Sequence, residues 1–192
     1  SANKIIPPAL KALADNPLSK IDGFILPGHV SIILGKDSYT DLGIRGVVSG
    51  FEPLDILTGI HMLIRQIRKG VVEVENAYSR AVTDKGNELM QKVMDEVFEI
   101  VDTPWRGLGV IPATGLGIRK KYSDYDAEKK FKVKYPEENE PAGCRCGEIL
   151  QGICIPTDCP LFGNKCLPDN PIGPCMVSSE GACSAYYKYE RD

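Results

Sequence analysis

The hydrophobic and polar positions of the first two thirds of the chain follow patterns typical of buried strands and amphipathic helices. A short helix is predicted at Pro7–Pro17, because paired prolines are tolerated in the first turn of a helix. Two short apolar runs read as buried strands, one at Ile21–Leu26, ended by proline and glycine, and one around Val47 and Val48. These runs predict the start of an alternating pattern of helices and strands.

Two longer segments show the spacing of amphipathic helices, Pro53–Lys69 and Asp84–Asp102. A further strand is predicted at Trp105–Ile111. The expected core-facing stripes of the two helices are Leu54, Leu57, Ile60, Ile64 and Ile67 in the first, and Leu89, Val93, Val97 and Ile100 in the second. Repeated strand–helix alternation predicts an α/β fold, with a mainly parallel sheet flanked by helices.

The composition changes sharply toward the C-terminus. The segment Lys120–Gly143 is highly charged and poor in aliphatic residues, which predicts a solvated linker or surface arm. From Cys144 onward, proline and glycine are frequent and no periodicity persists. This part can therefore bury little apolar surface and needs a further stabilising element, such as a bound metal. We therefore expect an α/β domain over residues 1–140, followed by a small irregular cysteine-rich iron–sulfur lobe over residues 141–192.

The net charge and the hydropathy of the chain bear on whether it binds nucleic acid or spans a membrane. The 192 residues carry a formal net charge of -3, so no basic surplus is available to neutralise phosphates, and nucleic-acid binding is not expected. No apolar run reaches the roughly 18 residues that a membrane span needs. The first residues lack the apolar core of a secretory signal, which favours a cytoplasmic protein. Cytosolic thiols stay reduced, and clusters of them usually bind metal or carry out redox chemistry.

All seven cysteines lie after residue 143. Four of them, Cys159, Cys166, Cys175 and Cys183, are widely spaced, whereas structural zinc sites usually contain tight CxxC pairs. Four-thiolate iron–sulfur sites vary more in spacing, so an iron–sulfur cluster is favoured over zinc. Of the other three cysteines, one could replace a ligand of this quartet, the Cys144–Arg145–Cys146 pair could be redox-active, and Cys154 is expected to pack as a small apolar residue.

Several long motifs carry a resemblance to a known family. Near the C-terminus these are "GCRCGEIL", "DCPLFGNKC" and "NPIGPCMVSSEGACSAYYKY". Upstream they are "LPGHVSIILG", "SGFEPLDIL", "YSRAV" and "FEIVDTPWRGLGVIP". In this order, the motifs resemble the C-terminal half of the hydrogenase maturation family HypD.

The resemblance implies a function. HypD-like proteins act as scaffolds in the assembly of the iron centre of nickel–iron hydrogenase, which carries two cyanides and one carbon monoxide. Their partners are a HypC-like chaperone and a HypE-like cyanide donor. They carry a [4Fe–4S] cluster, whose four ligands match Cys159, Cys166, Cys175 and Cys183 by position. The family's CGTH and GCPVC motifs are missing from this chain, so we expect it to hold the cluster without building the iron centre alone.

Two residues after predicted strands are candidates for a site in the α/β domain, because ligands gather at the carboxyl ends of parallel strands. His29 could shuttle a proton or hydrogen-bond an iron-bound cyanide, or it could simply cap a turn, with Ser31 as a helix N-cap. Glu52 is expected beside His29 as an acid or acceptor, although an acidic residue is stabilised at a helix start in any case. His61 is expected to be structural.

Other features carry less weight. The glycine-rich "ATGLGIR" lacks the Lys-Ser/Thr of a phosphate-binding loop, so no nucleotide site is predicted. Tyr186, Tyr187 and Tyr189 are expected to pack over the cysteine-rich lobe. Two alternatives to the cluster remain open: a zinc-stabilised interaction module, and a thiol–disulfide enzyme that uses Cys144 and Cys146. The second is disfavoured because the pair does not follow a strand at a helix start, where thiolates are usually activated.

Overall fold

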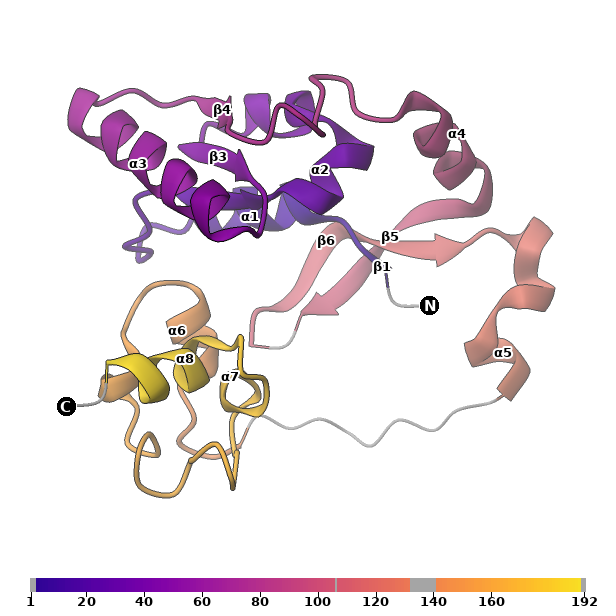
Figure 1. Ribbon diagram of the computed structural model, residues 1–192. Helices are drawn as coiled ribbons and strands as arrows, with labels where there is room; N and C mark the ends of the chain where they lie inside the picture. The colour runs from indigo at the N-terminus through magenta and orange to yellow at the C-terminus, as the bar shows by residue number, and fades with distance from the viewer. Residues whose placement is uncertain (1–2, 106, 132–140, 191–192) are drawn as a thin grey trace. The chain divides into compact units, whose positions relative to one another are not determined.

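The computed structural model describes residues 3–105, 107–131 and 141–190. These residues form two compact units. The first contains the described parts of residues 1–15, 21–102 and 112–132, and the second contains residues 16–20, 103–111 and the described part of 133–192. Figure 1 gives the labels of the helices and strands.

The first unit is built on a three-stranded parallel sheet in the order β2–β3–β4, which confirms the α/β prediction. The strands are β2 (Phe24–Pro27), β3 (Gly46–Ser49) and β4 (Val74–Asn76). All four residues of the central strand β3 are buried, as expected for a strand covered on both faces. Because the strands are parallel and in register, their carboxyl ends meet at one edge, formed by Pro27, Ser49 and Asn76.

Helices connect and cover these strands (Figure 1). They are α1 (Ile6–Ala14), α2 (Gly28–Leu34), the 3-10 helix η1 (Lys36–Leu42) and α3 (Pro53–Lys69). The apolar core of this unit is made of Leu26, Tyr39, Ile44, Val48, Val74 and Val82. Helix α1 begins with its two prolines in the first turn, as predicted, and α3 has the predicted bounds.

The region after β4 differs from the sequence predictions. Helix α4 (Glu88–Val97) is shorter than expected, and the chain continues directly into β5 (Phe98–Trp105), which holds the residue Ile100 that we assigned to the helix. The predicted strand at Trp105–Ile111 is wrong. Gly107 and Gly109 adopt positive φ angles of 78° and 73°, so the chain turns there into β6 (Gly109–Ile118).

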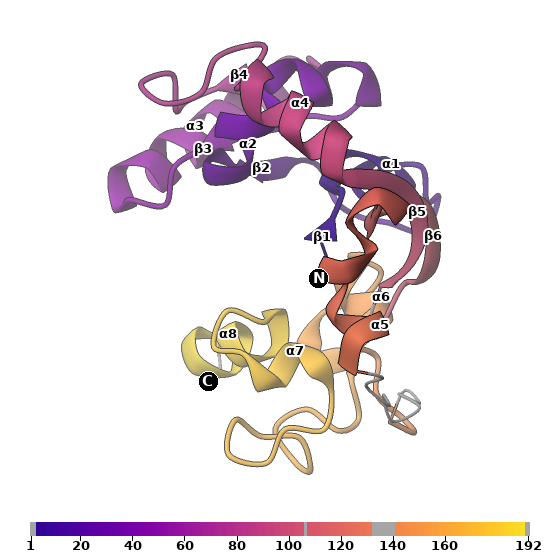
Figure 2. The same ribbon diagram turned by 90° about the vertical axis from the view of Figure 1, so that its right-hand side faces the viewer.

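Strands β5 and β6 form a second sheet with β1 (Asn3–Lys4), in the order β1–β6–β5 (Figure 2). The charged segment that follows holds η2 (Lys120–Tyr125) and α5 (Ala127–Phe131), so its first part is helical rather than a linker. The rest of that predicted linker, residues 132–140, lies outside the described residues. Among the helices that the structure describes, none combines the length and the apolar character required to cross a membrane.

The second unit consists of short helices and turns. Its elements are α6 (Cys146–Leu150), η3 (Pro156–Asp158), α7 (Pro174–Val177) and α8 (Ala182–Tyr189). Two glycines allow the β5–β6 turn to pack closely on α6, since a Cβ on Gly147 would lie 2.2 Å from the carbonyl oxygen of Gly107. This unit has its own core, and that core is made mainly of cysteine.

Candidate functional site

Five of the seven cysteines are buried together in the second unit. They come from separate short elements: Cys146 begins α6, Cys175 lies in α7, Cys183 lies in α8, and Cys159 and Cys166 lie in the turns between η3 and α7. Met176 and Ile149 complete this core. The irregular backbone therefore gathers thiols from a long stretch of sequence into one place.

Six of the cysteines line one small cavity of about 10 Å³. These are the four predicted ligands together with Cys144 and Cys146. Gly173 also lines the cavity, and a Cβ at this position would lie 2.5 Å from the Cys144 sulfur, so only glycine leaves room for that thiol. Cys154 does not line the cavity and packs against the outside of the core, as predicted.

Three thiols of this lobe, Cys144, Cys154 and Cys175, have pKa values above the ordinary range. The Cys183 thiol donates a hydrogen bond to the Cys175 sulfur over 3.6 Å, and this contact, together with burial, raises the pKa of Cys175. Burial also raises the pKa values of Cys144 and Cys154. Backbone groups contact two other sulfurs: the Ile172 N–H donates to the Cys166 sulfur over 3.3 Å, and the Cys159 thiol donates to the Gly143 carbonyl over 3.9 Å.

The donor set fits a thiolate-bound metal centre, because six soft sulfur ligands surround one cavity without competing oxygen ligands. Within the described parts of the chain, no three histidine, cysteine or acidic side chains converge closely enough to hold a metal ion as they stand. A bound cluster would therefore require the cysteine side chains to turn toward a common centre and the cavity to widen.

Aromatic side chains cover the cysteine core on one side. Phe162, which lines the cavity, makes edge-to-face contacts with Tyr186 and Tyr187 at ring-centroid distances of 6.1 Å and 5.9 Å. Tyr189 is exposed. The prediction that tyrosines pack over this lobe is therefore confirmed for Tyr186 and Tyr187 and is wrong for Tyr189.

A second group of polar and aromatic residues lies at the carboxyl edge of the parallel sheet. His29 follows β2 at the start of α2, and Glu52 follows β3 as the N-cap residue of α3. The Phe51 ring lies 4.8 Å from the His29 imidazole. Among the described residues, His29 and Glu52 make no hydrogen bond with each other, and their catalytic roles stay predictions.

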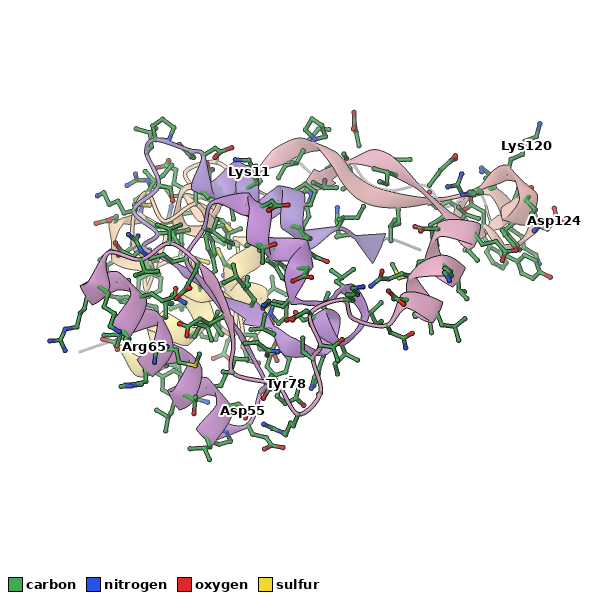
Figure 3. The ribbon with its side chains drawn as sticks, turned by 90° about the horizontal axis from the view of Figure 1, so that it is seen from above. Lys11, Asp55, Arg65, Tyr78, Lys120 and Asp124 are labelled. Atoms are coloured by element: carbon green, nitrogen blue, oxygen red, sulfur yellow. The ribbon has the colours of Figure 1, made fainter. Side chains whose placement is uncertain are left out.

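The segment after the third strand, β4, supplies two residues to this edge that were not predicted from the sequence, Tyr78 and Arg80. Figure 3 shows Tyr78 close to Asp55, which lies in the first turn of α3. The Arg80 guanidinium stacks on the Tyr78 ring at 4.4 Å and donates two hydrogen bonds to the Asp55 carboxylate, at 2.7 Å and 2.6 Å. No strand was predicted at Val74–Asn76, so the rule for the ends of parallel strands did not point to these two residues.

The Asp55–Arg80 pair is firmly held. Asp55 is buried, and the Arg80 guanidinium keeps the pKa of its carboxyl below the ordinary range. Arg80 also reaches the exposed Glu52 carboxylate at 3.3 Å. Glu52 is therefore bonded to Arg80, and two acidic groups share a single arginine.

Two glycines make this packing possible. A Cβ on Gly28 would lie 2.6 Å from the Tyr78 ring and 2.5 Å from the Ser49 carbonyl oxygen. A Cβ on Gly50 would lie 2.1 Å from the Asp55 carboxylate. The ends of β2 and β3 therefore approach Tyr78 and Asp55 more closely than any other residue type would allow.

Three smaller predictions have clear outcomes. Ser31 is not an N-cap: it lies buried within α2, where its hydroxyl donates to the Pro27 carbonyl at 2.9 Å and contacts the Tyr39 hydroxyl. His61, which we expected to be structural, is exposed on α3. The "ATGLGIR" segment lies largely in strand β6, which is no phosphate-binding loop.

The fold and this concentration of thiols define a class of small α/β proteins with an appended cysteine-rich lobe. Comparison with known proteins identifies the family. A sequence model of HypD, described as "Hydrogenase formation hypA family", matches residues 1–190. The chain belongs to the HypD family.

Individual relatives agree with this assignment. The chain is similar to the hydrogenase maturation factor HypD of Cupriavidus necator, at 48% identity over 89% of this chain and 46% of the relative. It is 44% identical to the HypD proteins of Azotobacter vinelandii, over 97% of this chain and 52% of the relative, and of Escherichia coli, over 96% and 51%. The chain thus spans about half the length of the curated relatives it matches.

Proposed function

We propose that this chain is the cluster-carrying part of a hydrogenase maturation factor, and that Cys159, Cys166, Cys175 and Cys183 hold a [4Fe–4S] cluster. The observation that carries this proposal is the single cavity lined by six cysteines. Such a cluster takes four thiolates and supplies or accepts one electron at a time. The lobe contains enough sulfur ligands for this cluster and offers no competing ligand type at the cavity.

The protein's own residues have distinct tasks in this proposal. The four cysteines lose their protons and bind, and the loops around Cys159 and Cys166 position two of the sulfurs. Phe162 and Tyr187 keep water away from the centre, which would influence its potential. Cys144 and Cys146 line the same cavity, so either of them could take the place of a ligand in the proposed quartet.

A full-length member of the family would use this cluster while the iron group of nickel–iron hydrogenase is assembled. That iron group, which carries two cyanides and one carbon monoxide, is the cargo. We propose a cytoplasmic scaffold that works with a HypC-like chaperone and a HypE-like cyanide donor. His29 and Glu52, at the strand ends, are the candidates for contact with the iron's cyanide ligands or for proton transfer. This half alone would hold the cluster without completing the iron group.

One observation favours a zinc-stabilised interaction module as the second candidate. The Cys175 and Cys183 sulfurs lie 3.6 Å apart. Two thiolates on one tetrahedral zinc, each bonded at about 2.3 Å, would lie about 3.8 Å apart. In a [4Fe–4S] cluster these cysteines would bind different irons and would have to separate.

The thiol–disulfide alternative has less support. Cys146 does begin helix α6, which corrects our expectation that the pair avoids a helix start. Burial, however, keeps the pKa of its neighbour Cys144 above the ordinary range, the opposite of what a reactive thiolate requires. The helix is also short, with five residues.

The test is a set of single cysteine-to-serine variants at the six cavity positions, purified without air and compared by visible absorption and bound iron. We expect loss of the cluster at Cys159, Cys166, Cys175 and Cys183. Cys154→Ser is the matched control, since Cys154 packs outside the cavity. Retained iron in all four ligand variants would disprove the assignment, and loss at Cys144 or Cys146 with retention at one of the four would identify the replacement.

A further inference from the structure

Helix α3 has the reverse of the usual amphipathic arrangement. Its buried residues are Asp55, Gly59 and Gln66. Its apolar stripe is exposed and consists of Leu54, Leu57, Ile60, Ile64 and Ile67. A helix on the surface of a domain normally turns such a stripe toward the core. In α3, the apolar stripe faces solvent instead.

The exposure is large and continuous. Leu54 and Leu57 are 74% and 64% exposed, and the stripe extends to Phe51 before the helix and to Val71 and Val72 after it. Single exposed apolar residues are ordinary on protein surfaces, but a contiguous apolar face of this length marks a site of interaction. We call the set Phe51, Leu54, Leu57, Ile60, Ile64 and Ile67 the α3 face.

The charges beside the α3 face indicate the chemistry of its partner. Arg68 and Lys69 lie exposed in the last turn of α3, and neither has an ion-pair partner among the described residues. Arg65, which Figure 3 shows far from Asp55 along the helix, pairs with Glu75. A partner that covers this face would therefore gain from acidic residues placed near Arg68 and Lys69.

A second copy of the chain fits this requirement poorly. If two α3 faces packed together, Arg68 and Lys69 would need acidic residues from the other α3. The acidic residues at the start of α3 are Glu52 and Asp55, and Arg80 already bonds both of them. A copy of this chain would thus offer apolar contact without charge complementarity.

We propose that the α3 face packs against a helix in the part of the HypD chain that the longer relatives carry and that this chain does not match. The relatives have about as many further residues again, since the chain covers 46% to 52% of their length. The docking helix has an apolar stripe with acidic residues on the flank that meets Arg68 and Lys69. This inference concerns the surface of α3 and does not depend on which metal the cysteines bind.

The experiment compares this chain with a chimera of full family length, in which the unmatched part of the Escherichia coli relative is joined to it in the relative's order. Hydroxyl-radical footprinting measures the exposure of the α3 side chains in both. We expect the labelling of Leu54, Leu57 and Ile64 to fall at least about threefold in the chimera, because docking removes them from water.

Substitutions on the α3 face test whether this face is responsible for the docking. Leu57→Asp with Ile64→Asp should lower the melting temperature of the chimera by at least about 5 °C and leave the chain alone unchanged within error. Leu18→Asp is the matched control, because Leu18 is 65% exposed and lies outside the α3 face. Arg68→Glu should also weaken docking and lower the melting temperature of the chimera.

Three results would overturn the proposal. In the first, the α3 face is labelled equally in the chimera and in the chain alone, which points to a separate protein. In the second, the chain alone forms dimers by light scattering that Leu57→Asp abolishes, which assigns the face to a second copy. In the third, the face is already protected in monomers of the chain alone, which assigns it to a contact within this chain.

Discussion

Substitution of Gly28 by alanine tests the construction of the strand-end site. The added Cβ would lie 2.5 Å from the Ser49 carbonyl oxygen and 2.6 Å from the Tyr78 ring. The ring can turn away, but the Ser49 carbonyl belongs to the central strand β3 and can move only with the sheet. Overpacking of this kind costs about 1–3 kcal/mol. With a urea dependence of about 2 kcal/mol per molar, the unfolding midpoint of the first unit should fall by about 0.5–1.5 M.

The assay is urea unfolding followed by far-ultraviolet circular dichroism, together with the proton NMR shifts of the His29 ring, which the Phe51 ring perturbs. Tyr78→Ala in the same chain should recover part of the loss, because it removes one of the two clashes. The control is Gly70→Ala, where the φ angle is +67° but nothing lies within 4 Å, so stability falls while the His29 shifts stay. An unchanged midpoint in Gly28→Ala would show that the strand ends are not packed as closely as these distances indicate.

Three further predictions follow from the two cores and the strand-end site. Leu26→Ala removes a side chain that is 1% exposed and should lower the free energy of unfolding by about 2–5 kcal/mol in the same urea assay. Because Arg80 lowers the pKa of Asp55, their pairing stabilises the fold above a pH of about 3.9 and is lost as the pH falls through the lower folded-state pKa. Arg80→Met should therefore be less stable at pH 7 and show a shallower loss of stability on acidification; an acid titration with the wild-type slope would contradict this. Phe162→Leu breaks the edge-to-face contacts with Tyr187 and should destabilise the cysteine-rich lobe by about 1 kcal/mol, seen as faster reaction of its thiols with a thiol reagent.

The sequence was informative where local patterns decide the structure. The apolar runs around Leu26 and Val48 are strands, because short buried segments ended by glycine or proline have few alternatives in a parallel sheet. The paired prolines at the start of α1 and the bounds of α3 were also predicted, since both depend on rules that act within a few residues.

Other features depend on contacts that a local pattern does not contain. The spacing of α3 predicted an apolar stripe correctly but assigned it to the core, and the structure turns the opposite side, with Asp55 and Gln66, toward the sheet. The positive φ angles of Gly107 and Gly109 convert an apparent strand into a turn. In both cases, tertiary packing decided between conformations that the sequence pattern allows.

The candidate site also contains residues that could be predicted from the sequence and residues that could not. The cysteines that surround the cavity could be named from their concentration near the C-terminus, but their number around it is six rather than four, because Cys144 and Cys146 fold back to join the others. At the strand ends, His29 and Glu52 were found from the rule for parallel sheets. Arg80 was missed, since its importance comes from its bonds to Asp55, which is 25 positions away in sequence.

The metal content of the wild-type chain after purification without air decides whether the cysteine-rich lobe holds an iron–sulfur cluster. Iron, acid-labile sulfide and zinc would be measured per chain, together with the visible absorption spectrum. A [4Fe–4S] cluster bound to the four cysteines would give about four irons and four sulfides per chain and a brown protein. A colourless protein with one zinc per chain and no sulfide would contradict it and would make the cysteine-rich lobe a zinc-stabilised module.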